Sequence, residues 1–305
     1  MALALEINPM QIPFLKYKRI YYIFSGLLTI GSVIVVLTFG LKFGIDFTGG
    51  SVLEVVFEQR PENPVILEKL KDLNLGDITI QPTGEKGVII KLKEIDETTH
   101  QQILSRLNEI SKTEEGNFES IGPMIGKELR QKTIILIIVS LVALLIYIAI
   151  SFRRVSRPLS SWQYGIISIV ALSFDVLVPI GGFAILGKLY NVQFNIPIIT
   201  ALLTILGYTI NDKVIVFDRI RENLLRGRAG DFEYLVDQSL NQTLFRSLST
   251  GSCTLFVLLT IFFFGGETLK YFAFTLIIGI TVGTYSSLFL AAPLLVSWLG
   301  LRAKK

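Results

Sequence analysis

The chain has 305 residues, 51% of them hydrophobic and only 18% charged, a composition that excludes an ordinary water-soluble globular protein. The formal net charge of +4 comes from short Lys and Arg clusters beside apolar stretches rather than from a basic surface interleaved with aromatic residues, so nucleic-acid binding is not expected. One cysteine, Cys253, and one histidine, His100, provide neither an intrachain disulfide nor a metal-ligand set.

The first apolar stretch covers residues 21–41. A helix of about 20 residues crosses about 30 Å of hydrocarbon, so this length predicts a membrane span. The stretch is too long for the apolar part of a signal peptide, and no small-residue cleavage site follows it. We therefore expect it to remain as a membrane anchor.

An insert at residues 42–130 mixes polar and apolar residues in the manner of a soluble domain. Its order of elements, βαββαβ, predicts an α+β ferredoxin-like domain. Because the insert holds no nucleophile–base pair and no phosphate loop, we expect it to bind or handle another molecule rather than to catalyse a reaction. His100 lies in a polar stretch and is expected to be a solvated surface residue without a catalytic role. Strands are predicted at 51–57, 78–81, 88–92 and 118–121, and amphipathic helices at 64–73 and 98–110.

Five further apolar stretches complete a predicted bundle of six transmembrane helices. Before the fifth span, apolar residues at helical spacing over 232–240 indicate a short amphipathic helix, either on the membrane interface or in a solvated loop. The predicted organisation is a cytoplasmic N-terminus with the first span (1–41), a periplasmic domain (42–130), and spans two to six with a cytoplasmic C-terminus (131–305). Spans two to six are predicted at 133–152, 164–186, 196–217, 242–264 and 271–299.

The basic clusters set the orientation of these spans. With six spans, every cluster falls on one face of the membrane, whereas the short connections on the other face hold only Lys188 and Lys270. The positive-inside rule assigns the basic face to the cytoplasm and the insert to the outside. The clusters comprise Lys16, Lys18, Arg19, Arg153, Arg154, Arg157, Arg219, Arg221, Arg226, Arg228, Arg302, Lys304 and Lys305.

Two carboxylates lie inside predicted spans: Asp175 near the middle of the third, and Asp212 nearer the cytoplasmic end of the fourth. A charge at mid-helix costs about 3 kcal/mol on insertion scales, so such a residue usually faces a bundle interior or a water-filled path. Burial disfavours the ionised form and a nearby cation favours it. A carboxyl poised between these influences can bind and release protons as its access changes, so Asp175 and Asp212 are both candidates for proton transfer.

Asp212 has a candidate counter-ion in Arg246, near the cytoplasmic end of the fifth span. Arg246 could bridge to Asp212 or could instead extend to the headgroups as an orientation signal, and the spacing alone does not separate these hypotheses. Tyr208 and Thr209 precede Asp212 by one helical turn and could hydrogen-bond its carboxylate. The small or polar residues around Asp212 are Gly207, Tyr208, Thr209 and Asn211.

The segment at 207–223, Gly-Tyr-Thr-Ile-Asn-Asp-Lys-Val-Ile-Val-Phe-Asp-Arg-Ile-Arg-Glu-Asn, closely resembles the signature of the SecF family, accessory subunits of the bacterial Sec protein-export machinery. Three further segments resemble the same family: Phe-Thr-Gly-Gly at 47–50, Asn-Gln-Thr at 241–243 with Arg246 after it, and Gly-Thr-Tyr-Ser-Ser at 283–287. The resemblance covers nearly the whole chain.

This resemblance implies a function. SecF-like proteins work with SecD beside the SecYEG channel, and the pair resembles the resistance-nodulation-division (RND) transporters in membrane architecture. A multi-pass protein of the bacterial inner membrane that uses the proton motive force to assist preprotein export is therefore implied, without a cofactor. By match to the motif, Asp212 and Arg246 would transfer protons, Arg219 and Arg221 would be structural, and the 47–50 turn would join the first span to the outer domain. The return hinge into the second span would comprise Gly122, Pro123 and Gly126.

The chain departs from the family pattern at two positions. The family usually has His before the third-span aspartate, where this chain has Phe174, and this removes a titratable neighbour of Asp175. The family also favours a small hydroxyl residue after Asn-Asp, where this chain has Lys213. Adjacent helical residues point about 100° apart, so Lys213 need not pair with Asp212 and could reach the cytoplasmic interface. A nearby cation would nevertheless favour the ionised form of Asp212 and shift proton coupling to lower pH.

Three other functions stay open, as does the choice of H⁺ or Na⁺ as the driving ion. A self-sufficient proton-driven exporter of small molecules would need more spans than this chain has. An intramembrane aspartyl protease could use Asp175 and Asp212, but such proteases carry Gly-x-Gly-Asp, and here Tyr-Thr-Ile-Asn precedes the second aspartate. A passive scaffold would stabilise the translocon without moving protons.

Overall fold

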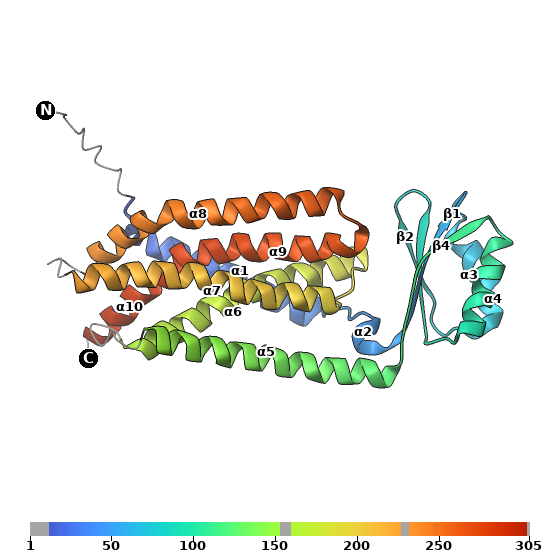
Figure 1. Cartoon of the computed structure of the whole chain (residues 1–305), viewed down its shortest axis with the longest axis horizontal. Coiled ribbons are helices and arrows are strands. Elements are labelled where there is room, and N and C mark those ends of the chain that lie inside the picture. Colours follow the sequence, from blue (N-terminus) through green and yellow to red (C-terminus); the bar gives the residue numbers. More distant parts are fainter. Residues whose placement is uncertain (1–11, 153–159, 227–231, 304–305) are drawn as a thin grey trace, which may run out of the picture. The chain divides into compact units, whose positions relative to one another are not determined.

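The computed structural model describes residues 12–152, 160–226 and 232–303 (Figure 1). The chain divides into two compact units. The first, called the helical bundle below, comprises residues up to 41, 137–192 and those from 197 onward; the second, called the outer unit, comprises 42–136 together with 193–196. Six of the basic residues used to predict the orientation lie outside the described residues: Arg153, Arg154, Arg157, Arg228, Lys304 and Lys305.

Six helices of the described chain are long and apolar enough to cross a membrane, which confirms the predicted number of spans. A short 3-10 turn, Phe14–Tyr17, leads into the first of them. The last is a composite in which a π-helical turn, Ser287–Ala291, separates α9 from α10. The helices are α1 (Lys18–Phe39), α5 (Pro123–Ser151), α6 (Ser161–Tyr190), α7 (Ile196–Leu225), α8 (Phe232–Phe264), α9 (Glu267–Ser286) and α10 (Ala292–Ala303).

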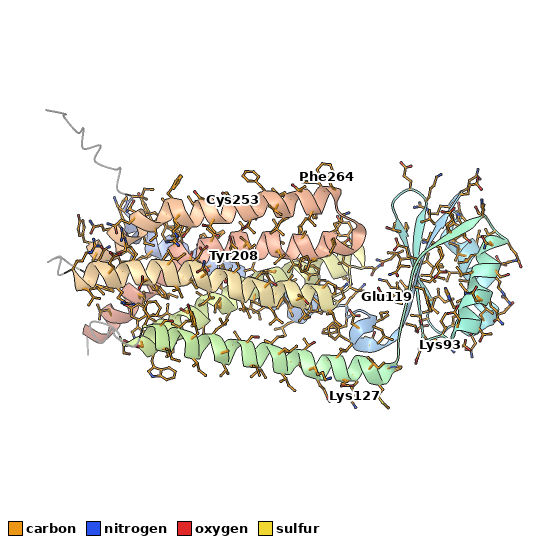
Figure 2. All side chains as sticks on the ribbon, in the orientation of Figure 1. Lys93, Glu119, Lys127, Tyr208, Cys253 and Phe264 are labelled. Atoms are coloured by element: carbon orange, nitrogen blue, oxygen red, sulfur yellow. The ribbon has the colours of Figure 1, made fainter. Side chains whose placement is uncertain are left out.

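Much of the outer surface of the bundle is apolar. Phe245, Phe256 and Phe264 project outward from α8. Phe264, labelled at the end of that helix in Figure 2, is 87% exposed. Lipid tails are as apolar as these side chains, so burying the side chains inside the bundle would gain no hydrophobic free energy in a membrane. The interior instead combines apolar side chains such as Tyr164 and Phe217 with buried charged residues.

The fifth span is longer than the sequence predicts. The segment expected to form a separate amphipathic helix is the beginning of α8, which continues without a break to Phe264. Leu235, Val236 and Leu240 pack in the core of the bundle. Both readings of the segment, as an interfacial helix and as a solvated loop helix, are therefore wrong, because its apolar face meets protein.

The outer unit contains the predicted ferredoxin-like fold. Its four strands form one antiparallel sheet in the order β2-β3-β1-β4, and Figure 1 shows α3 and α4 on one face of that sheet. Leu53, Val55 and Phe57 point from β1 into a core completed by Ile66 and Ile103 of the two helices. The elements are β1 (Gly50–Phe57), α3 (Asn63–Leu70), a 3-10 turn (Lys71–Leu73), β2 (Thr79–Thr83), β3 (Gly87–Leu92), α4 (Glu97–Asn108) and β4 (Thr113–Ile121).

Two glycines form the corner that leads into this sheet. The short helix α2 (Ile45–Thr48) ends at Gly49 and Gly50, whose φ angles are +74° and +130°. A Cβ atom on Gly49 would lie 2.7 Å from Cα of Pro123, and one on Gly126 would lie 2.9 Å from the nitrogen of Gly49. Only glycine satisfies both the backbone angles and this close approach. The beginning of α5 is thus packed backbone to backbone against the corner, with Gly126 inside a continuous helix.

Candidate functional site

A buried ion pair joins α6 to α7. Nζ of Lys213 lies 2.6 Å from Oδ2 of Asp175, and both side chains are fully buried, with 0% exposure. The hydroxyl of Ser286, at the end of α9, donates a hydrogen bond to the other carboxylate oxygen, Oδ1. Both oxygens of Asp175 are therefore occupied. Removing one partner of such a pair leaves an uncompensated charge in the interior, which typically costs about 3–5 kcal/mol.

The position of Lys213 corrects one sequence prediction. This residue does not reach the cytoplasmic interface, because its partner is an aspartate 38 positions earlier on another helix. Phe174, which occupies the position where the SecF pattern has His, packs its ring 6.2 Å from that of Tyr285. Phe174 and Lys213, the two departures from the family pattern, therefore both lie beside Asp175. The helix position before Asp175 is apolar, and α7 supplies the cation beside it.

Asp212 is as deeply buried as Asp175 but has far fewer partners. Its side chain is 1% exposed, and the hydroxyl of Thr284 approaches Oδ2 at 3.5 Å, the outer limit of a hydrogen bond. No described residue forms an ion pair with Asp212. Arg246 is exposed on α8 and likewise makes no ion pair with any described residue, so the pairing considered from the sequence is not formed in this structure.

Tyr208 and Thr209, one helical turn before Asp212, make no hydrogen bond to its carboxylate within the described residues. The hydroxyl of Tyr208, labelled in Figure 2, bonds with the carbonyl oxygen of Thr250 at 3.1 Å and with Oγ1 of Thr254 at 2.9 Å on α8. Oγ1 of Thr209 is buried and finds no hydrogen-bond partner among the described residues. The hydrogen bonds predicted from these two residues to the carboxylate are therefore absent from the described structure.

A pair of glycines explains how α9 comes so close to these carboxylates. Gly279 and Gly283 are four residues apart, the spacing that lets membrane helices touch. A Cβ atom would lie 2.1 Å from Cδ1 of Ile205 at the first glycine and 2.0 Å from Cγ2 of Thr209 at the second. The π-helical turn begins directly after Ser286, and such turns occur frequently at functional sites. The close contact of α9 with α7 lies beside the hydroxyls of Thr284 and Ser286, which bond with Asp212 and Asp175 respectively.

A polar surface also runs along the outside of α7 and α8. Thr204, Gly207 and Asn211 are exposed at helical spacing on α7, and Arg246 and Thr250 are exposed on α8. We call these five residues the α7–α8 polar face. Polar groups on the outside of a spanning helix are unfavourable in hydrocarbon, and they normally meet another polar protein surface.

Comparison with known proteins places the chain in a family. Residues 101–301 match the family described as protein export membrane protein SecD/SecF, C-terminal, and residues 34–59 match the SecD/SecF GG motif. The protein translocase subunit SecF of Thermobaculum terrenum is 40% identical over 303 residues, covering 94% of each chain. The SecF subunit of Vibrio alginolyticus is 35% identical over 294 residues, covering 93% of this chain and 88% of that one.

The chain belongs to the SecF family. Among solved structures, the crystal structure of SecDF, a translocon-associated membrane protein from Thermus thermophilus, superposes with a TM-score of 0.84 at 32% identity. The match covers 96% of this chain and 39% of that one, so the chain spans well under half of the SecDF polypeptide. A SecDF structure described as a super-membrane-facing form gives a TM-score of 0.70 at 33% identity. This SecF chain is therefore a multi-pass membrane protein of RND-like fold with a role in protein export.

The C-terminal half of the SecF signature connects α7 to α8. Nε of Arg219 donates to Oε1 of Gln242 at 2.7 Å, and Nδ2 of Asn223 donates to Oγ of Ser239 at 2.8 Å and to the same oxygen of Gln242 at 3.0 Å. Arg221 forms an ion pair with Asp218 one turn earlier, at 3.1 Å. These contacts link the two helices and brace the end of α7, and the structural role that the resemblance implies for both arginines stays a prediction.

The aspartyl protease hypothesis gains no support from this geometry. The oxygens of Asp175 bond with Lys213 and Ser286, and no hydrogen bond joins its carboxyl to that of Asp212 among the described residues. Such a protease needs two carboxyls that share a site and a proton. Within the described chain, no three His, Cys, Asp or Glu side chains come together as a metal site either.

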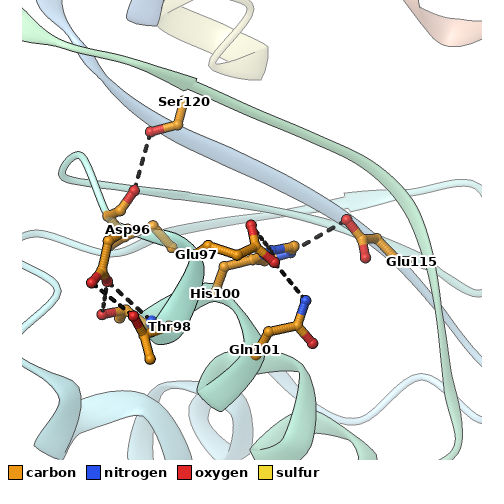
Figure 3. A network of polar contacts seen from close by, with 9 residues as sticks. Asp96, Glu97, Thr98, His100, Gln101, Glu115 and Ser120 are labelled. Carbon is orange, nitrogen blue, oxygen red and sulfur yellow. Dashed lines mark hydrogen bonds and ion pairs between the residues drawn. The ribbon is translucent and has the colours of Figure 1, made fainter.

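His100 of the outer unit is buried, which makes the prediction of a solvated surface residue wrong. Only 3% of its surface is exposed, and its ring is stacked on that of Phe118 with centroids 3.8 Å apart. Nδ1 lies 3.2 Å from Oε1 of Glu97, and Nε2 lies 3.3 Å from Oε1 of Glu115 (Figure 3). The residues beside His100 in the sequence are polar and therefore indicated exposure. The burial comes from β4, a strand later in the chain, which brings Phe118 and Glu115 against the ring.

Proposed function

We propose that this SecF chain acts with SecD to use the proton motive force across the bacterial inner membrane for preprotein export through the SecYEG translocon. Both termini lie in the cytoplasm, and the ferredoxin-like domain lies in the periplasm. The observation that carries the proposal is the state of Asp212, a buried carboxyl on a spanning helix without an ion pair among the described residues.

The two buried aspartates differ in how readily they can exchange a proton. Asp175 is neutralised by Lys213 and hydrogen-bonded by Ser286, so its charge is balanced in place. Asp212 forms no ion pair with any described residue, and Lys213 beside it is engaged by Asp175. An unpaired buried carboxylate is costly, so the ionisation of Asp212 depends on water or a cation reaching it. Arg246 on the neighbouring helix α8 is the cation able to approach when α7 and α8 rearrange. We therefore assign proton transfer to Asp212 and Arg246, and a stationary ion pair to Asp175 and Lys213.

The α7–α8 polar face supports the SecD partnership. It carries the guanidinium of Arg246, which forms no ion pair within the described ranges, on the outside of a spanning helix, where hydrocarbon would be a poor solvent for it. A second membrane subunit with polar side chains at this depth satisfies these groups. SecD is assigned to this face, with Asp212 directly behind it on α7.

The proposal is tested by Asp212→Asn, which keeps the size of the side chain and removes its titration. We expect the variant to co-purify with SecD as the parent does, while the part of preprotein translocation that depends on the proton motive force is lost. Asp218→Asn, an exposed acid on the same helix, is the matched control and keeps this stimulation. Repeating the assay with and without Na⁺, and with a protonophore, identifies the driving ion. Full stimulation in Asp212→Asn would favour a passive scaffold instead.

A further inference from the structure

Residues 193–196, at the end of the connection between α6 and α7, group with the outer unit rather than with the bundle, although this connection joins two spanning helices. The amide of Phe194 donates to the carbonyl of Lys42 at 2.7 Å, and the amide of Gly44 donates to the carbonyl of Phe194 at 2.9 Å. These two bonds form a parallel bridge between residues 43 and 194. The rings of Phe43 and Phe194 also meet edge to face, with centroids 6.0 Å apart.

Asp46 extends this pairing to the first residue of α7. Oδ2 of Asp46 accepts a hydrogen bond of 2.8 Å from the amide of Ile196, where α7 begins. The first amides of a helix have no partner within it, and the N-terminus carries a partial positive charge, so a carboxylate stabilises it. The next residue, Pro197, has no amide hydrogen to offer. The first turn of α7 is thus capped by a side chain from the beginning of the outer unit.

The same short segment leads directly into the sheet. Asp46 belongs to α2, which ends at the Gly49–Gly50 corner, and β1 begins at Gly50. That corner is packed against Pro123 and Gly126 with no room for a Cβ atom, which leaves little freedom between α2 and the sheet. Along α7, Asp212 lies sixteen residues after Ile196, about 24 Å at 1.5 Å per residue. One continuous helix therefore connects the capped end to the buried carboxyl.

We infer that these contacts, which we call the α2–α7 clamp (residues 42–46 with 193–196), make the base of the outer domain follow α7. Asp46 is a positioning residue that transmits movement of the helix carrying Asp212 to the domain that handles exported polypeptide. This inference rests on the proposed function and adds the place where the membrane event reaches the outer domain. The clamp stays closed during the cycle, because it works by moving as one body with α7.

The first experiment weakens the clamp. Asp46→Ala removes the cap, and Asp46→Asn keeps an acceptor while removing the charge. Loss of a cap costs about 1 kcal/mol, equivalent to about a 5-fold change in an equilibrium. We therefore expect the translocation that depends on the proton motive force (called force-dependent translocation below) to fall about 5-fold in Asp46→Ala and less in Asp46→Asn. Translocation without the proton motive force should not change. Asp77→Ala, an exposed acid of the same unit, is the matched control.

The second experiment replaces the lost contact with a covalent one. A Cβ atom on Gly44 would lie 3.3 Å from Cβ of Asn195, close to the 3.5–4.5 Å found across disulfides. Gly44→Cys and Asn195→Cys are introduced with Asp46→Ala in a chain whose single cysteine is removed by Cys253→Ser. Oxidation should restore force-dependent translocation to near the parent level, and reduction should remove it again. Because the disulfide joins residues 44 and 195 without restoring the carboxylate, a reversible rescue would show that translocation requires the connection between the two segments rather than the charge of Asp46.

The outcomes separate the two proposals. If Asp212→Asn loses force-dependent translocation while Asp46→Ala keeps it, the clamp inference is overturned and the proposed function stands. If oxidation fails to rescue Asp46→Ala, or if the disulfide blocks translocation with Asp46 present, the clamp does not move with α7 as one body. If Asp212→Asn and Asp46→Ala both keep full stimulation, both proposals fail. Loss in Asp46→Ala with reversible rescue by oxidation supports the inference.

Discussion

The helical bundle and the outer unit place their charged residues in opposite ways. In the outer unit the interior is apolar, built from residues such as Leu53 and Ile103, and most charged side chains face solvent. In the bundle, large apolar residues such as Phe264 face outward, while Asp175, Lys213 and Asp212 are buried. Since hydrocarbon accepts apolar surface freely, the bundle gains specificity from contacts between small and polar groups.

Two lysines show what this difference means for a single charge. Lys213 is fully buried and is balanced by Asp175. Lys91 of the outer unit is partly buried beside the neutral Gln81, to which it donates a hydrogen bond of 2.8 Å. Burial, followed by repulsion from Lys42, lowers the pKa of Lys91 to about 8. The charge of Lys213 in the bundle is thus balanced by a specific partner. The charge of Lys91 in the outer unit has no such partner within the described chain, and it is tolerated because water reaches the side chain and the ammonium group can lose its proton.

The largest expected effect is that of breaking the buried pair. Lys213→Met leaves the carboxylate of Asp175 without its cation and should destabilise the bundle by about 3–5 kcal/mol. Combining it with Asp175→Asn should recover most of that loss, because no buried charge remains. Thermal unfolding in detergent, followed through Trp162 and Trp298, measures both. Lys188→Met, at an exposed lysine, is the control. An equal loss of stability in this control would contradict the view that the bundle depends on its buried ion pair.

Removing the same apolar group should have different effects in the two regions. Ile103→Ala opens a cavity in the core of the outer unit and should cost about 3 kcal/mol. Ile30→Ala, on the exposed surface of α1, leaves no cavity and should change the stability of the chain by less than about 0.5 kcal/mol. Urea midpoints from pulse proteolysis of the full-length chain compare the two. Similar losses would show that the outward face of α1 is packed after all.

The glycines of α9 provide a third test. Gly283→Ala places a Cβ atom 2.0 Å from Cγ2 and 2.8 Å from Cβ of Thr209, so we expect a loss of about 2 kcal/mol as α7 and α9 separate. Gly182→Ala is the matched control, because its Cβ atom would lie 3.8 Å from Cδ1 of Ile278, an ordinary contact. That variant should be as stable as the parent or slightly more so. Detergent melting curves of the two variants decide whether the close approach is required.

The smallest expected effect concerns Lys91. Its folded-state pKa of about 8 is below the ordinary value of 10.5, so the unfolded chain binds more protons between these pH values and stability rises with pH across that window. Lys91→Met should therefore stabilise the outer unit at pH 7 by about 1 kcal/mol, a figure reduced by partial exposure to water. The gain should shrink at pH 10. Pulse proteolysis in urea at the two pH values measures it, with the exposed Lys93→Met as control. A gain that does not vary with pH would assign the effect to packing.

The sequence by itself determined the six spans, the βαββαβ order of the insert and the membership of a family with carboxylates inside the membrane. These properties follow from local regularities. The length of an apolar stretch sets whether it can cross a membrane, and periodicity within a few residues sets which face of a helix or strand is apolar. The choice of Asp212 over its neighbours also came from the sequence, and its role in proton transfer stays a prediction.

Only the tertiary structure decided which distant groups meet. The partner of Lys213 on α6, the burial of His100 under β4, the continuation of residues 232–240 into α8, and the capping of α7 by Asp46 were not foreseen. Each joins residues far apart in the chain or replaces an expected break. Periodicity predicts that the apolar face of a helix or strand will be buried, but it does not predict which element will cover that face. The covering element depends on how all the helices and strands pack together.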